Sequence, residues 1–241
     1  MRIKRTHDEF YLQEDRRSTP KEYFKFISRY SFSFIESLEN PSILDIGCAT
    51  GDYLWYLSMI HKDARFYGMD VMHKLMVTAK SRLPQSVFFK GNIFTGQGLP
   101  SKKFDVVFML GVHSIFDSHE PWINNLLKLV KSHGRIFVFG MFNPEPIDVL
   151  VKARYSITGK VWEPGWNVFS LLTLTHYLKK KKTKSSFIPW TIPIDIKKNN
   201  KDTLRSWTFK DKQGARLVVN GTQVLHHFYL LEIIPHARKK I

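Results

Sequence analysis

The sequence has a single cysteine, Cys48, among its 241 residues. One thiol cannot form an intramolecular disulfide, which agrees with a reducing compartment. Long hydrophobic runs are also missing, since no apolar stretch approaches the roughly 20 residues that a membrane-spanning helix needs. The N-terminal stretch MRIKRTHDEFYLQEDRR lacks the apolar segment of a secretory signal. We therefore expect a cytoplasmic protein without a transmembrane segment.

Acidic residues are scarce, with 21 Asp and Glu against 37 Lys and Arg and a net charge of +16. The imbalance is uneven along the chain. Residues 1–40 hold 8 basic and 7 acidic residues, residues 41–150 hold 11 and 9, and residues 151–241 hold 18 and 5, a net +13. The positive charge therefore belongs to the C-terminal third, where it makes an anionic partner the natural expectation.

The chain is organised around residues 42–52, SILDIGCATGD. An apolar run enters a turn that contains Gly47, Ala49 and Gly51, and the helix-like YLWYLSMI follows. This pattern indicates a buried strand that hands over to a helix, whose N-terminus carries free backbone N–H groups. Such a strand–turn–helix unit is typical of a ligand-binding turn.

Two nucleotide-binding motifs are absent from this turn. No Gly-Lys-Ser/Thr follows it, which excludes a phosphate-binding Walker loop. The dinucleotide fingerprint G-x-G-x-x-G is not met either, because Gly47 and Gly51 are four residues apart with Ala49 between them. Asp52 would also place a carboxylate beside a pyrophosphate. The turn therefore favours a ligand without phosphate.

A second strand over residues 64–70 ends in a carboxylate, Asp70, 19 residues beyond Gly51. A strand–turn–helix–strand path gives this spacing, and a carboxylate at that point can accept hydrogen bonds from both hydroxyls of a ribose. If the ligand carries an adenine on this ribose, Met69 and Val71 would flank that adenine. The alternative for Asp70 is the N-cap of the following helix.

The pattern D-x-G-x-x-x-G at residues 45–51, with Asp70 after it, resembles the class I methyltransferases that use S-adenosylmethionine (SAM). The C-terminal pattern RSWTF…RLVVNG…LHHFYLLEI resembles the ends of bacterial members of this family from surface-polysaccharide or secondary-metabolite pathways. The resemblance implies a Rossmann-like α/β fold with a seven-stranded sheet, helices on both faces and an antiparallel C-terminal hairpin. It implies adenine contacts after the third strand, a methyl-facing residue after the fourth, and an N-terminal aromatic lid. The expected SAM ligands are Asp45, Gly47, Cys48, Ala49, Gly51, Asp70, Val71, Asn92, Ile93, Leu110 and Tyr11.

We expect one methyltransferase domain over residues 1–241. Residues 1–40 form an N-terminal helical segment, residues 41–142 the cofactor-binding core, residues 143–202 a lid inserted between strands 5 and 6, and residues 203–241 the C-terminal hairpin. The stretch EPIDVLVKARYSI within the lid looks helical. Asn220-Gly221 predicts the turn of the hairpin, because Asn-Gly between two β-rich runs is a strong hairpin signal.

Methyl transfer requires the protein mainly to align nucleophile and methyl at about 3 Å and to exclude water. An aliphatic hydroxyl acceptor also needs a base. His113, three residues beyond the fourth strand, is the first candidate, and His119 is the second. His226 or His227 could serve instead, although adjacent strand residues face opposite sides. A histidine without a chemical role is the alternative for each, and no spacing indicates a metal site.

Three functions follow from these patterns. The first is a SAM-dependent methyltransferase acting on an oxygen or nitrogen of a glycan or small metabolite under an aromatic lid. The second is an RNA methyltransferase whose basic C-terminal third contacts phosphates; the same charge could attract an anionic membrane surface or a lipid-linked anionic glycan. The third is a non-catalytic SAM-fold partner subunit, against which the intact Asp45, Gly47, Gly51 and Asp70 argue. The oligomeric state is left open.

Overall fold

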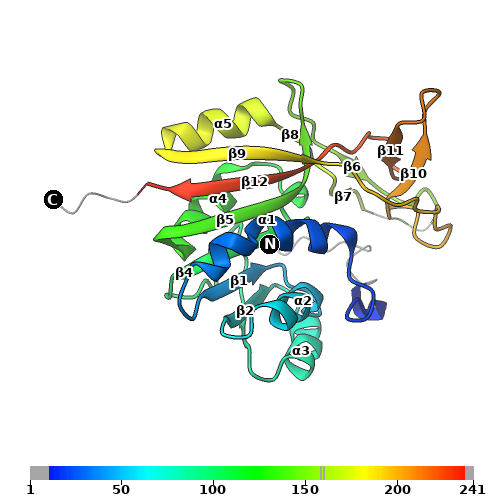
Figure 1. The fold of residues 1–241 in the computed structure, drawn as a ribbon. Helices are drawn as coiled ribbons and strands as arrows, with labels where there is room; N and C mark the ends of the chain where they lie inside the picture. The colour runs from blue at the N-terminus through cyan, green and yellow to red at the C-terminus, as the bar shows by residue number, and fades with distance from the viewer. Residues whose placement is uncertain (1–10, 158, 160, 237–241) are drawn as a thin grey trace.

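The computed structural model describes residues 11–157, 159 and 161–236. Its centre is a sheet with the strand order β3-β2-β1-β4-β5-β12-β9, with the short strand β8 paired to the end of β5 (Figure 1). Strand β12 is antiparallel to both of its neighbours, and the remaining pairs are parallel. The strands are β1 (Ser42–Ile46), β2 (Arg65–Asp70), β3 (Val87–Lys90), β4 (Phe104–Leu110), β5 (Val130–Asn143), β8 (Phe169–Ser170), β9 (Thr183–Trp190) and β12 (Phe228–Pro235). The predicted Rossmann-like α/β fold is confirmed.

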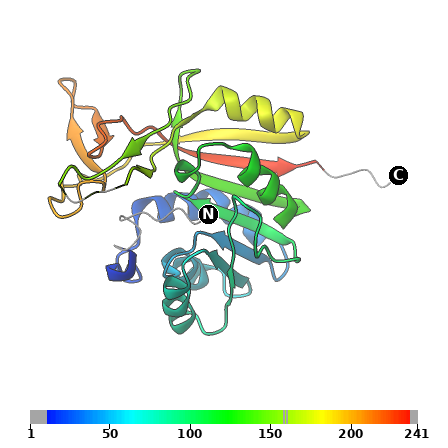
Figure 2. The same ribbon diagram turned by 180° about the vertical axis from the view of Figure 1, so that it is seen from behind.

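Helices cover both faces of this sheet (Figures 1 and 2). On one face, Phe24 and Ile27 of α1 and Leu57 of α2 pack in one buried cluster with strand residues. On the other, Trp122 of α4 and Leu178 of α5 belong to a second cluster. The helices are α1 (Glu22–Glu36), α2 (Asp52–Ile60), α3 (His73–Arg82), α4 (Glu120–Leu129) and α5 (Leu171–Lys180), and η2 (His113–Ile115) is a short 3-10 turn. Among the described helices, none combines the length and apolar character needed to cross a bilayer.

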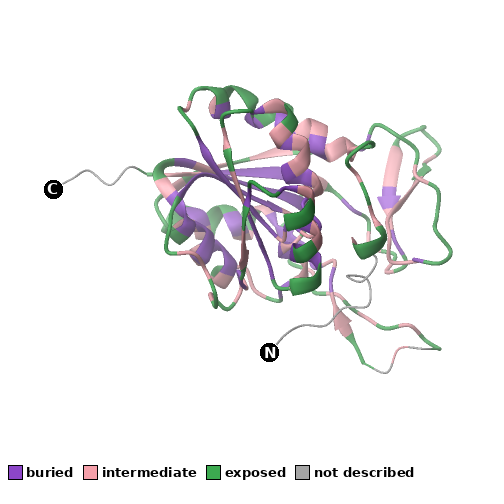
Figure 3. Ribbon diagram, turned by 90° about the horizontal axis from the view of Figure 1, so that it is seen from below, coloured by how far each residue is buried: buried purple, intermediate pink, exposed green. Residues whose placement is uncertain are grey.

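The central strands β1 and β4 are apolar runs buried along nearly their whole length, as expected for parallel strands that are covered on both faces (Figure 3). β1 lies between β2 and β4. The carboxyl ends of β1, β2 and β4 therefore meet at one edge of the sheet, where the loops that follow them come together. This is the edge at which ligands bind in open α/β sheets.

The C-terminal part of the chain differs from the prediction. The sixth strand of the sheet, β9, lies inside the range predicted as a lid, so the insertion that follows β5 is shorter than expected. Residues 191–227 then leave the sheet and form a separate two-stranded hairpin of β10 (Trp207–Lys210) and β11 (Arg216–Val219) before the chain returns as β12. We call residues 191–227 the excursion.

The Asn220-Gly221 pair does not form the turn of this hairpin, so that prediction is wrong. The turn spans residues 211–215, where the Asp211 carboxylate accepts the N–H groups of Gln213 and Ala215. Asn220 instead follows β11 and is fully buried, with its Nδ2 donating to the carbonyl of Leu204 at 3.0 Å. Its local sequence matches a hairpin signal, but tertiary packing uses it to hold the excursion together.

The predicted helix over residues 145–157 is also wrong. Asn143 holds a turn there, because its Oδ1 accepts the N–H of Glu145 and its Nδ2 donates to the carbonyl of Ile147. The chain beyond is extended: Val149 bridges Val168, and β6 (Lys152–Ala153) pairs with β7 (Glu163–Pro164). Backbone groups that would bond within a helix are thus used between extended segments.

Candidate cofactor-binding site

The turn after β1 has a backbone conformation that suits few residues. Gly47, Ala49 and Gly51 have φ angles of +73°, +46° and +80°, in the left-handed region. A Cβ on Gly47 would lie 2.3 Å from a side-chain carbon of Val112, so a side chain has no room there. The N–H groups of Gly47 and Cys48 donate to the carbonyl of Met69 at 2.7 and 3.2 Å. These bonds fix the turn against the end of β2.

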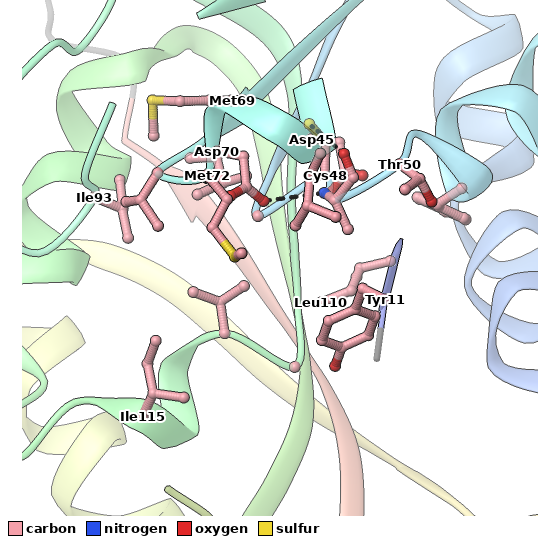
Figure 4. Close-up of a pocket in the computed structure, with 18 of the residues that line it drawn as sticks. Tyr11, Asp45, Cys48, Thr50, Met69, Asp70, Met72, Ile93, Leu110 and Ile115 are labelled. Carbon is pink, nitrogen blue, oxygen red and sulfur yellow. Dashed lines mark hydrogen bonds between the residues drawn. The ribbon is translucent and has the colours of Figure 1, made fainter. Parts of the chain in front are cut away.

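A cavity of about 420 Å³ opens between this turn and the carboxyl ends of β2 and β4 (Figure 4). Its size is within the roughly 300–1,000 Å³ typical of small-molecule sites. Gly51 does not line it and instead caps α2. The other predicted SAM ligands all line it: Tyr11, Asp45, Gly47, Cys48, Ala49, Asp70, Val71, Asn92, Ile93 and Leu110. The structure thus brings together residues that come from five separate parts of the chain.

Asp70 is held in place by the backbone of two loops. One carboxylate oxygen accepts the N–H of Ala49 at 3.0 Å and the other accepts the N–H of Met72 at 2.8 Å. The residue is buried and stands at the end of β2, as the sequence predicted. A carboxylate has about four acceptor sites, so Asp70 can accept more bonds than these two.

Asp45 is the second buried carboxylate of the cavity, with a 3% exposed side chain. Burial raises the pKa of this carboxyl well above its ordinary value, and the charge of Asp70 raises it further. Two carboxylates that disfavour each other's ionisation are stabilised by a positive group placed nearby. The electrostatics of the cavity therefore favour a ligand with a cationic end.

Asn92 lines the cavity, and its side chain also builds the loop after β3. Its Oδ1 accepts the N–H groups of Phe94 and Thr95 at 2.8 and 3.2 Å. Such a turn role is common for Asn, whose side chain readily bonds to nearby backbone groups. Since Oδ1 is used by the loop, the Nδ2 group is the part of Asn92 available to a ligand.

Glu14 is a lining residue that sequence reasoning missed. It belongs to the N-terminal segment that carries Tyr11, and it forms ion pairs with Lys21 at 3.1 Å and with Arg205 of the excursion. Burial opposes the ionisation of Glu14, but Lys21 and Arg205 outweigh it and lower the pKa to about 2. No local pattern signals a partner so far along the chain, so only the fold reveals this contact.

The two histidines predicted as bases lie outside the cavity. His113 is fully buried, with its Nε2 3.0 Å from the carbonyl oxygen of Met141 and its ring stacked on Phe142 at 4.5 Å. A Cβ on Gly140 would lie 2.3 Å from this ring, so the glycine makes the space that the imidazole occupies. Burial lowers the pKa of His113 to about 4.

His119 packs edge-on against the rings of Phe169 and Tyr177, with centroids 5.4 and 5.0 Å away. His226 is buried beside Ser206, and His227 is exposed. None of these side chains lines the cavity. At the position where the sequence placed a base, the cavity wall is apolar and consists of Val112, Ile115 and Phe116.

Residues 44–136 match the family model of a methyltransferase domain. A curated relative, the tRNA (guanine-N(7)-)-methyltransferase of Prochlorococcus marinus, is 30% identical over 126 residues, which cover 49% of this chain and 55% of that protein. The matches to curated relatives cover between 32% and 55% of their own length. The chain therefore spans about half or less of these proteins.

Solved structures match over nearly the whole chain. A SAM-dependent methyltransferase from Clostridium acetobutylicum has a TM-score of 0.61 at 10% identity, with 96% of this chain and 100% of that one covered. The plantazolicin methyltransferase BpumL, solved with S-adenosylhomocysteine and a desmethylPZN analog, has a TM-score of 0.57 at 16% identity, with 95% of each chain covered. At these identities the likeness shows the fold.

The chain thus has the Rossmann-like fold of the solved SAM-dependent methyltransferase from Clostridium acetobutylicum. Residues 44–136, which run from β1 into β5, match the methyltransferase-domain model over less than half of the chain. The resemblance found in the sequence is confirmed.

Proposed function

We propose that the protein is a SAM-dependent methyltransferase that acts on an oxygen or nitrogen atom of a glycan or a small metabolite. The observation that carries this proposal is the cavity itself, which is lined by the buried carboxylates Asp45 and Asp70 and, apart from them in Figure 4, by the apolar Ile115. A cofactor with a cationic amino acid end and a ribose fits this division of polarity.

Each part of the cavity wall has a role in this proposal. Asp45 and the backbone of Gly47 to Ala49 hold the amino acid end, and Asp70 accepts the ribose hydroxyls. Val71, Asn92 and Ile93 surround the adenine. Leu110 and Tyr11, which lie beside each other in Figure 4, face the transferable methyl. Bound there, SAM supplies an electrophilic methyl group.

The protein contributes alignment and the exclusion of water. Residues Val112, Ile115 and Phe116 form a wall without proton donors where the nucleophile enters, so a nucleophile reaching it loses its hydration. Among the described residues that line the cavity there is no histidine. An acceptor whose reacting atom is already unprotonated near neutral pH, such as a carboxylate or a weakly basic nitrogen, therefore suits the site better than a sugar hydroxyl.

A methyltransferase acting on RNA is the second candidate, which the tRNA-modifying relative and the basic C-terminal third favour. The match to that relative covers 49% of this chain, which is too short to include both the whole core and the whole excursion. We rank it second for this reason.

Incubation with methyl-labelled SAM tests both candidates. Acceptor fractions of neutral glycans, acidic glycans, small metabolites and total RNA are supplied separately, with an Asp70→Ala variant as the matched blank. Label that moves into a glycan or metabolite fraction with the wild type alone supports the proposal. Transfer of label into RNA alone would overturn the proposal in favour of the RNA methyltransferase. No transfer into any fraction, together with retained SAM binding, would favour a non-catalytic subunit.

A further inference from the structure

Two groups of lysines in the C-terminal third of the chain lie apart from each other in the fold. The distal patch consists of Lys179 to Lys182 with Lys184, at the end of α5 and the start of β9. Strand register pairs Thr183 with Pro235 at the end of β12, whereas Phe228 at the start of β12 pairs with Met141 near the carboxyl end of β5. The distal patch therefore lies at the amino ends of the parallel strands, away from the cavity. Figure 1 shows the start of β9 on the side opposite to β10 and β11.

The second group, which we call the mouth patch, consists of Lys197, Lys198 and Lys201 in the excursion. The loop that carries it is tied to the hairpin, because the N–H of Thr208 donates to the carbonyl of Ile196. The same loop ends at Arg205, whose guanidinium pairs with Glu14 in the cavity wall. The mouth patch is thus attached directly to the rim of the cavity.

The positive charge of the mouth patch is not neutralised within the excursion. This segment holds 7 Lys and Arg against 3 Asp. Each aspartate is already engaged: Asp195 pairs with Arg216 at 2.7 Å, Asp202 is 1% exposed and pairs with Arg205, and Asp211 binds backbone N–H groups of the hairpin turn. The three lysines are exposed and form no ion pair with a described carboxylate.

Basic groups also surround Glu14 on the rim beside this patch. Three cations contact the single carboxylate of Glu14, namely Lys21 at 3.1 Å, Arg16 at 3.6 Å and Arg205. Lys21 itself lines the cavity. A line of positive charge therefore leads from the cavity wall at Lys21 through Arg205 to the three lysines. At Trp207, Lys198 places its Nζ 4.9 Å from the ring centroid, so a flat apolar surface accompanies the charge.

We propose that the mouth patch binds the acceptor and that the acceptor is anionic, a glycan or metabolite with carboxylate, phosphate or sulfate groups beyond the methylated atom. This inference rests on the proposed function and names its substrate class. Several exposed cations around one entrance raise the local concentration of an anionic ligand and speed its association, and salt screens the effect. The distal patch lies too far along the strands to contact an acceptor that is held at the cavity.

Binding of two anionic probes, heparin as a sulfated polymer and inorganic tripolyphosphate as a small polyanion, tests the proposal. Dissociation constants are measured for the full chain, for the mouth variant K197A/K198A/K201A, and for a control variant that removes the same charge from the distal patch, K179A/K180A/K182A. We expect the mouth variant to bind at least one probe about tenfold more weakly, and the control within about twofold of wild type, in roughly 0.1 M salt. Binding of heparin alone would indicate a polymeric acceptor. Binding of tripolyphosphate as well would indicate a small acceptor.

Equal weakening in both variants, or none in either, would overturn the proposal. So would wild-type binding of poly-U RNA accompanied by no binding of either probe. SAM affinity is measured on the same three proteins and is expected to be unchanged, because neither patch lines the cavity. A wild type that binds the probes through the mouth patch but does not bind SAM would refute the proposed function while leaving the anion site standing.

Discussion

Arg205 pairs with Glu14, and this ion pair joins the excursion between β9 and β12 to the N-terminal segment at the rim of the cavity. The two residues come from opposite parts of the chain, and their contact places the excursion against a residue of the cavity wall. The same segment is held from below by Arg82 of α3, which pairs with Asp52 at 2.8 Å and donates to the carbonyl of Glu14 at 3.3 Å. Charged contacts as well as packing thus hold the N-terminal segment at the rim of the cavity.

Removing the rim contact should weaken cofactor binding. We expect Arg205→Ala to raise the dissociation constant for SAM about fivefold, since an ion pair of this exposure contributes roughly 1 kcal/mol and orders the segment that carries Tyr11. Arg216→Ala is the matched control, because it removes an arginine that pairs with the exposed Asp195 in the same excursion. Calorimetric titration measures both. Equal losses in the two variants would show that the rim contact has no special role.

The ribose contact should be worth more. We expect Asp70→Ala to weaken SAM binding by about 2 kcal/mol or more, which is roughly thirtyfold, because a charged acceptor of two hydrogen bonds is lost. Asp70 also holds the backbone of Ala49 and Met72, so thermal unfolding is recorded alongside. The exposed Asp63→Ala serves as the control. Wild-type affinity in a folded Asp70→Ala protein would mean that the ribose is bound elsewhere.

Gly47 should not tolerate a side chain. Gly47→Ala places a methyl group 2.3 Å from Val112, in addition to the strain of a left-handed backbone, and we expect a lower Tm and lost SAM binding. Gly214→Ala is the matched control, because Gly214 has a φ of +82° and open space around the added Cβ. It should cost only the backbone strain, about 1 kcal/mol. A Gly47→Ala protein no less stable than the control would contradict the geometry of the turn.

Two buried histidines should make stability depend on pH. Burial lowers the pKa of His113 and of His226 to about 4, against 6.5 for an unperturbed histidine. Below pH 6.5 the unfolded chain takes up protons that the folded chain does not, so stability should fall as the pH drops from 6.5 to 4. The pKa of Glu14 is lowered from 4.5 to about 2, so its contribution to stability begins to be lost near pH 4.5 and is gone below about pH 2.

Urea unfolding at several pH values between 7 and 4 tests this expectation. Between pH 7 and pH 4, the His113→Asn variant should lose less of its unfolding free energy than the wild type does. The difference should be a few kcal/mol at most, since a shift of one pKa unit corresponds to about 1.4 kcal/mol. The exposed His227→Asn should leave the slope unchanged. His113→Asn should also retain SAM affinity, because the ring lies outside the cavity. A slope that is equally steep in all three proteins would show that other groups cause it.

The meeting of the glycine turn with Asp70 could be predicted from the sequence because these residues follow each other at fixed spacings. The turn at Gly47 to Gly51 and the carboxylate of Asp70 are set by one strand–turn–helix–strand path, and the chain length between them fixes their meeting. Local pattern is enough wherever a single supersecondary unit builds the contact.

The remaining features depend on contacts between distant segments. His113 turns away from the cavity because Gly140 on β5 leaves room for its ring, and nothing near His113 in the sequence signals that space. Asn220 has a hairpin sequence but is buried against Leu204. Glu14 meets Arg205 only because the excursion folds back over the N-terminal segment. In each case tertiary packing overrides the local preference.

Titration of the wild-type protein with SAM, and separately with NADH, tests the central claim most directly. The account predicts one site per chain that binds SAM with a dissociation constant in the micromolar range, about −8 kcal/mol, and no measurable binding of NADH. Binding of NADH without binding of SAM would contradict the assignment of the turn, the carboxylates and the cavity to a methyl-donor cofactor.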